Sequence, residues 1–294
     1  MCRFVLYQGP SISIADLVTR PVHSIIRQSF KAEELAEPLN GDGFGVAWYV
    51  TETSEKPAVF RDITPAWNNE NLRHLARVTR SGTILAHVRA ATPGLTVTQT
   101  NCHPFVHGRY AFMHNGNLAG FMKARQKLLS LLSEAAFAAI RGTSDSEHIF
   151  GLFLDRLAER KEDKPVERMA NALEATLRQL AEIVPRGDEP STLNLAVTDG
   201  SNTVVSRCIF GDLARATTLY MREGQRFRCK NGLCVMDAVS EGGTECPTCN
   251  EASAVLIASE PLFEHETWSP VDPQHLVLVD ANRQVTRRPL WLAR

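Results

Sequence analysis

The sequence predicts an α+β domain in which antiparallel sheets are layered against helices. Strand-like apolar segments come first, helical periodicity occupies the middle of the chain, and strand-like segments return at the end. A doubly wound parallel sheet would instead alternate strands and helices along its whole length. With 294 residues the chain is within reach of one large domain. We therefore expect residues 2–294 to fold as a single domain.

The N-terminal part of the chain contains four apolar runs with the length and flanks of buried strands. These runs are residues 2–7, 44–50, 82–89 and 110–113, the first of them ended by Pro10. Apolar residues at helical spacing predict helices over 22–30 and 68–78. The turn sequence Asn40-Gly41-Asp42-Gly43 separates the first helix from the second strand.

The middle of the chain is predicted to be helical and the last third to return to strands. Periods of three to four residues predict helices over 118–132, 146–160 and 165–184. Ser144 and Glu147 fit a capping box for the second of them. Strands are expected at 192–198, 203–209, 217–221, 254–259 and 275–279. Asp199-Gly200 predicts a hairpin turn between the first two of these strands, because such turns need positive φ angles.

Composition excludes several classes of partner. Hydrophobic residues make up 44% and charged residues 22% of the chain, as in ordinary globular proteins. The net charge of −1 leaves no basic excess for a nucleic acid or an anionic membrane. No stretch approaches the roughly 18–20 apolar residues that span a bilayer. Arg3 and Pro10 interrupt the N-terminal run too early for a signal peptide, so we expect a cytoplasmic protein.

Cys2 is the first candidate for chemistry. Removal of Met1, which we expect, would leave a thiol and a free α-amine on one residue. The ordinary pKa of such an amine is about 7.7–8.0, so it can accept the thiol proton near neutral pH. That arrangement is nucleophilic catalysis with a built-in base. The alternative is that Cys2 is only a small buried apolar residue, and its position alone does not decide between the two.

An amidase of this kind also needs charged and polar groups for its substrate. A cation is needed for a carboxylate, an anion for an ammonium, and donors for the oxyanion. Arg89 ends an apolar strand, Asn115 and Gly116 follow the next strand, and Asp145 lies at a helix start. Taken singly, each has a simpler reading as a salt-bridge residue, a turn or a helix N-cap.

Taken together, the motifs resemble those of the class II glutamine amidotransferases. The matching segments are Met1-Cys2-Arg3, Asn40-Gly41-Asp42-Gly43-Phe44-Gly45, His87-Val88-Arg89-Ala90-Ala91-Thr92, Asn101-Cys102-His103-Pro104-Phe105, His114-Asn115-Gly116-Asn117 and Thr143-Ser144-Asp145-Ser146-Glu147. Ala258-Ser259-Glu260-Pro261-Leu262 extends the resemblance towards the C-terminus. The resemblance implies a four-layer αββα N-terminal-nucleophile hydrolase sandwich with antiparallel sheets.

The resemblance also implies a role for each candidate. Cys2 is the nucleophile and its α-amine the base. The Asn115 side chain and the Gly116 backbone N–H form the oxyanion hole. The glutamyl end of the substrate is bound by Arg89 and Thr92 at its carboxylate and by Asp145 at its ammonium. No cofactor is needed for this catalysis.

The chain lacks a phosphate loop or a sugar-phosphate-binding domain that would use released ammonia. It therefore resembles the stand-alone branch of the family, which includes the ergothioneine-pathway γ-glutamyl amidohydrolase and the amidotransferase-like subunit of the glutathione-degrading complex. The function implied is hydrolysis of a γ-glutamyl amide, either glutamine or a γ-glutamyl thiol compound. The alternative is a glutaminase-like subunit that supplies ammonia to, or binds ligand for, a partner chain.

Four of the seven cysteines cluster in residues 222–253, a polar segment that we interpret as an insertion within the domain. Their spacing is Cys229-x4-Cys234-x11-Cys246-x2-Cys249, and the last pair has the spacing at which two thiolates share a tetrahedral metal. A structural Zn²⁺ is one hypothesis. Reduced surface thiols or a redox pair are the alternatives.

Overall fold

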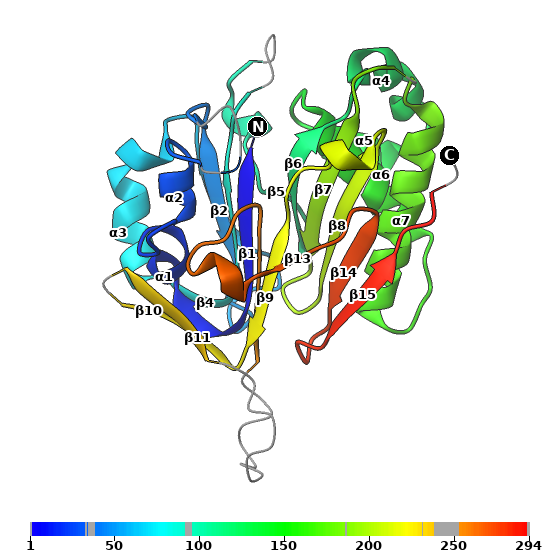
Figure 1. Ribbon diagram of the computed structural model, residues 1–294. Helices are drawn as coiled ribbons and strands as arrows, with labels where there is room; N and C mark the ends of the chain where they lie inside the picture. Colours follow the sequence, from blue (N-terminus) through cyan, green and yellow to red (C-terminus); the bar gives the residue numbers. More distant parts are fainter. Residues whose placement is uncertain are drawn as a thin grey trace.

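Two antiparallel sheets stack face to face, and helices cover both outer faces, in a four-layer αββα arrangement (Figure 1). This computed structural model describes residues 2–32, 34, 39–91, 96–185, 187–230, 232–237 and 253–292. The predicted fold class is confirmed. The first strand begins near one end of the sandwich (Figure 1).

The first sheet has seven strands, and β1 lies at its centre. In spatial order they are β13 (Ser269–Pro270), β9 (Tyr220–Gly224), β12 (Ala254–Ala258), β1 (Arg3–Ser13), β4 (Arg80–Val88), β2 (Phe44–Trp48) and β3 (Ala58–Asp62). The outer face of this sheet is covered by α1 (Ile14–Val18), α2 (Ile25–Gln28) and α3 (Glu70–Val78) (Figure 1).

The second sheet has six strands. In spatial order they are β15 (Val285–Pro289), β14 (His275–Val279), β8 (Thr203–Phe210), β7 (Ser191–Thr198), β6 (Tyr110–Asn117) and β5 (Phe105–His107). It is covered by α4 (Phe121–Leu129), α5 (Glu134–Ala139), α6 (Asp145–Ala158) and α7 (Pro165–Ile183) (Figure 1). A separate hairpin of β10 (Arg226–Lys230) and β11 (Leu233–Asp237) packs against the helical side of the first sheet through Phe227 and Met236.

A layer of buried apolar side chains fills the space between the sheets. It includes Phe4, Leu6, Leu85, Met113 and Val205, all at most 1% exposed. Successive side chains of a strand point to opposite faces, so Phe4 and Leu6 face the second sheet and Val5 faces the helices. By the same alternation, Cys2 lies on the face that meets the second sheet.

Several predicted boundaries were wrong in instructive ways. β1 continues through Pro10 to Ser13. Proline has no backbone N–H to donate, but the pairing with β4 is interrupted by a register shift between Gln8 and Ile12, so Pro10 need not donate to the neighbouring strand. The helix expected over 22–30 is only α2, Ile25–Gln28. The helix expected over 118–132 is the shorter α4, Phe121–Leu129. The sequence pattern did not predict α5, which follows it and which Ser133 caps by accepting from the N–H of Ala136.

Other local predictions are confirmed. The segment Asp199–Asn202 joins β7 and β8 as a hairpin, with Gly200 at φ +95°. Ser144 caps α6 by accepting from the N–H of Glu147. The predicted capping box is only half formed, because the Glu147 carboxylate accepts from the N–H groups of Arg141 and Gly142 rather than from that of Ser144. Among the described residues, no helix combines the length and the apolar character that a membrane span requires.

Candidate active site

Strand pairing fixes the position of Cys2. Arg3 of β1 lies opposite Val88 of β4, so Cys2, one residue earlier, lies opposite Arg89. The Cys2 thiol donates to the carbonyl oxygen of Ala90 at 3.5 Å. Burial raises the pKa of this thiol, and the contact with Ala90 and the charge of Arg89 oppose that rise only in part. The resting thiol is therefore protonated at neutral pH and needs a base to become a nucleophile.

Arg89 is buried, at 4% exposure, and is held by the turn before β2. Its backbone N–H donates to the carbonyl of Gly43 at 2.9 Å, and its own carbonyl accepts from the N–H of Asp42 at 3.0 Å. One guanidinium N–H donates to the Asp42 carbonyl at 3.3 Å. The Asp42 carboxylate accepts from the N–H of Ala91 at 2.8 Å. Asp42 therefore fixes both sides of Arg89, a role that sequence reasoning missed although it singled out the turn.

Asn115 and Gly116 lie inside β6, where they pair with Asn194 and Leu193 of β7. The expectation that they follow the strand as a turn was wrong, because the ladder to β7 continues to Asn117. The Asn115 side chain is 1% exposed, and its Nδ2–H donates to the Ser259 hydroxyl at 3.0 Å. Gly116 adopts φ +154°, where glycine is favoured.

Asp145 is the first residue of α6, and the preceding Ser144 is its N-cap. One Asp145 oxygen accepts from the N–H of Leu118 at 2.8 Å and the other from the N–H of Ser146 at 2.7 Å. The positive end of the helix dipole stabilises a carboxylate at this position. The Asp145 charge contributes to raising the pKa of the Cys2 thiol, so the two groups are electrostatically coupled.

Four of the predicted site residues thus meet at one end of the sandwich. Cys2 and Arg89 come from the first sheet, Asn115 from the second, and Asp145 from the helix that covers the second. Thr92 lies outside the described residues. The site therefore combines a thiol, a cation, an anion and an amide donor drawn from both halves of the fold.

Three histidines lie buried near this end of the molecule. The rings of His87 and His103 stack at 4.1 Å between centroids, and His87 Nε2–H donates to the carbonyl of His114 at 3.0 Å. Burial lowers the pKa of His87 to about 3 and holds the pKa of His103 well below its usual range. Cys102 directs its sulfur to the carbonyls of Asp62 and Thr98, away from the stacked His103 ring. No Cys–His pair forms there.

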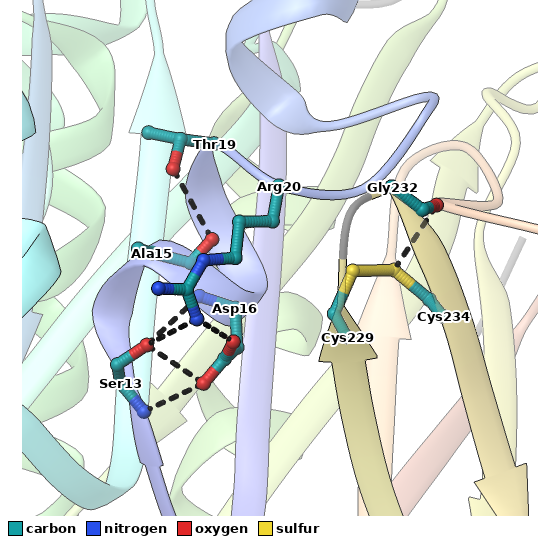
Figure 2. Close-up of a disulfide and its surroundings, with 8 residues drawn as sticks. All are labelled: Ser13, Ala15, Asp16, Thr19, Arg20, Cys229, Gly232 and Cys234. Atoms are coloured by element: carbon teal, nitrogen blue, oxygen red, sulfur yellow. Dashed lines mark hydrogen bonds and ion pairs between the residues drawn. A yellow bond between two sulfur atoms is a disulfide. The ribbon is translucent and has the colours of Figure 1, made fainter.

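The zinc hypothesis is not supported. Cys229 and Cys234 lie opposite each other in the β10–β11 hairpin and are joined by a disulfide (Figure 2). Their sulfurs are bonded to each other and so supply no thiolate for a metal. Cys246 and Cys249 lie outside the described residues. Within the described part of the chain, no group of three or more His, Cys, Asp or Glu side chains is arranged to hold a metal ion.

An αββα sandwich with a cysteine at the head of a central strand is the architecture of the N-terminal-nucleophile hydrolases. A family model described as "Glutamine amidotransferases class-II" matches residues 23–287. The chain belongs to this family.

Two relatives match almost the whole chain. The probable glutamine amidotransferase DUG3 of Saccharomyces cerevisiae is 39% identical, over 99% of this chain and 84% of its own. The gamma-glutamyl-hercynylcysteine sulfoxide hydrolase of Mycolicibacterium smegmatis is 26% identical, over 97% of this chain and 99% of its own. A solved class-II glutamine aminotransferase domain protein from Silicibacter pomeroyi shares the fold, with a TM-score of 0.63 and 24% identity, over 99% of this chain and 100% of its own.

Proposed function

We propose that this chain hydrolyses a γ-glutamyl amide through a thioester on Cys2. The observation that carries the proposal is geometric: Cys2 lies opposite Arg89 at the end of the β1–β4 ladder, and Asp145 binds the N–H of Leu118 directly after the strand that carries Asn115 and Gly116. A free glutamyl end carries a carboxylate and an ammonium, which the Arg89 and Asp145 side chains match. The planar guanidinium of Arg89 suits a carboxylate because it offers two parallel N–H donors.

The reaction begins once Met1 has been removed. The free α-amine of Cys2 takes the thiol proton, and the thiolate attacks the γ-carbonyl carbon of the substrate. The Asn115 amide and the Gly116 N–H stabilise the oxyanion of the tetrahedral intermediate. The intermediate collapses by breaking the C–N bond, and the leaving amine takes the proton from the Cys2 ammonium. Water then hydrolyses the thioester, which releases a free γ-carboxylate and regenerates the thiol.

We further propose that the substrate is glutamine or a γ-glutamyl thiol compound. The mycobacterial relative is named for a γ-glutamyl compound that contains a cysteine sulfoxide, which supports a sulfur-containing γ-glutamyl substrate over glutamine. The proposed mechanism needs no cofactor, because the base belongs to the nucleophile itself. Residues 2–294 would act as one domain with 222–253 as an insertion. We also propose the cytoplasmic location that is expected from the sequence.

The test is the intact mass of the purified protein before and after incubation with 6-diazo-5-oxo-norleucine, an electrophilic glutamine analogue. We expect a mass that lacks Met1 and then a single adduct, which peptide mapping places on Cys2. Excess glutamate should slow adduct formation by occupying Arg89 and Asp145. A retained Met1, or an adduct on another residue, would reject the proposal.

A second candidate function is the supply of ammonia to a partner chain. The yeast relative supports it, since it is named an amidotransferase rather than a hydrolase. The two functions differ in what happens to the amine that leaves the γ-glutamyl group: hydrolysis releases it, whereas an ammonia-supplying subunit passes it to a partner chain. Turnover of a γ-glutamyl thiol compound by the isolated chain favours hydrolysis, whereas turnover of glutamine alone, stimulated by a co-purifying chain, favours ammonia supply.

A further inference from the structure

Ser259 follows β12 and connects the two sheets at the site. The N–H of Phe4 donates to the Ser259 hydroxyl at 3.0 Å, and the N–H of Ser259 donates back to the Phe4 carbonyl at 3.0 Å. The same hydroxyl accepts from the Asn115 side chain at 3.0 Å. One oxygen atom therefore joins the strand that begins beside Cys2 to the amide expected to stabilise the oxyanion.

Ser259 is also what fixes the orientation of that amide. Within the described residues, the Oδ1 atom of Asn115 is buried and has no hydrogen-bond partner. The contact of Nδ2 with Ser259 is therefore the one described hydrogen bond that orients the side chain. Ser259 itself is 1% exposed, and its carbonyl accepts from the Thr218 hydroxyl at 3.0 Å, so its position is fixed on more than one side.

Glu260, the residue after Ser259, is linked to Cys2 through Arg3. Its carboxylate accepts from Arg3 Nε at 2.7 Å, in an ion pair whose side chains are 5% and 0% exposed. Another guanidinium N–H of Arg3 donates to the carbonyl of Cys2 at 2.9 Å. Side chains alternate along β1, so Arg3 lies on the opposite face from the Cys2 thiol. The ion pair thus positions Arg3, which binds the backbone carbonyl of Cys2 from the face of the strand opposite the thiol.

We propose that Ser259 and Glu260 are positioning residues for the amide hydrolysis described above, on which this inference rests. Ser259 acts through Asn115, and Glu260 acts through Arg3 on Cys2. Ser259 and Glu260 are adjacent residues directly after the end of β12. Together they therefore determine the distance between Cys2, the nucleophile, and Asn115, the oxyanion donor. Misplacing either group weakens interactions made in the transition state more than substrate binding.

The first test is Ser259→Ala, assayed with L-glutamine and with γ-glutamyl p-nitroanilide. We expect kcat to fall by about 10- to 100-fold while KM changes less than about twofold. Ser259→Thr keeps the hydroxyl and should recover most of the lost kcat. Ser81→Ala is the matched control. Ser81 is buried, and its hydroxyl likewise accepts from a backbone N–H, that of Thr83, but it pairs with Ile12 at the other end of β1 from Cys2.

The second test is Glu260→Gln, which keeps an oxygen for Arg3 but removes the charge. We expect kcat to fall several-fold at unchanged KM. A folded Ser259→Ala variant with wild-type kcat would overturn the inference, as would an equal loss of kcat in Ser81→Ala. If the wild-type chain neither turns over these probes nor forms a Cys2 adduct, the proposed function fails instead, so the two failures are distinguishable.

Discussion

A β-carbon added to Gly116 would lie 1.8 Å from the carbonyl oxygen of Thr192, on the neighbouring strand β7. No side chain fits there, and backbone atoms cannot move aside as the end of a long side chain can. The family resemblance assigned the backbone N–H of this glycine to the oxyanion hole. The structure adds a reason for glycine at this position, which is close approach of the adjacent strand.

Gly116→Ala should therefore both destabilise the fold and displace the proposed oxyanion donor. We expect a loss of at least about 2 kcal/mol in the free energy of unfolding, because the two strands must separate to admit the methyl group. Urea denaturation measures this. Gly187→Ala is the control, since a β-carbon at Gly187 meets nothing within 4 Å. Equal stability of the two variants would contradict the packing argument.

Arg89→Lys should raise KM at least about tenfold, because a point charge cannot replace a two-pronged donor at a carboxylate. Steady-state kinetics with glutamine or another γ-glutamyl substrate measure the change. Arg178→Lys serves as the control, because Arg178 lies on α7 in an exposed ion pair with Glu174. Unchanged KM in Arg89→Lys would show that this side chain does not bind the substrate carboxylate.

Cys2→Ala should abolish turnover but preserve binding of glutamate, since Arg89 and Asp145 remain in place. Isothermal titration calorimetry reports the binding and an ammonia assay the turnover. Cys208→Ala removes a buried free thiol elsewhere and should remain active. Residual wild-type activity in Cys2→Ala would exclude Cys2 as the nucleophile.

Stability should fall as the pH drops below about 6.5, the ordinary histidine pKa. The pKa of buried His87 is lowered to about 3 in the folded state, and that of His103 is also lowered. The unfolded chain therefore binds more protons than the folded chain in this range, and acid favours unfolding. Between pH 6.5 and 5.5 each histidine should cost about 1 kcal/mol.

Urea denaturation of His87→Gln at the two pH values checks this assignment. The variant should lose less stability on acidification than the wild type does. His74→Gln, at an exposed position on α3, should behave like the wild type. A stability that does not change between pH 6.5 and 5.5 would contradict neutral burial of these rings.

The sequence singled out the candidate site residues that stand in short, continuous motifs. Cys2, Arg89 and Asp145 stand at a strand start, a strand end and a helix start, which local patterns locate well. The contact of Asn115 with Ser259 could not be predicted in this way, because the two residues are 144 positions apart and meet only where the two sheets stack against each other. The hydrogen bonds between Asp42 and Arg89 also join residues far apart in the sequence, and they depend on the pairing of β2 with β4.

The cysteine cluster shows the limit of spacing arguments. Four residues between Cys229 and Cys234 are compatible with a shared metal, but the two cysteines also face each other across the paired strands β10 and β11. The register of β10 on β11 decides between these outcomes. That register follows from packing of Phe227 and Met236 on the first sheet, which no local pattern reveals.

The two halves of the site belong to different sheets, with a layer of apolar side chains between them. Sliding one sheet over the other by a fraction of an ångström would change the distance from Cys2 to Asn115 without breaking a strand. Trimming an interior side chain such as Leu85 or Met113 should thus slow turnover at temperatures where the protein is still folded. Catalytic rate would then report on the alignment of the two sheets before spectroscopic melting does.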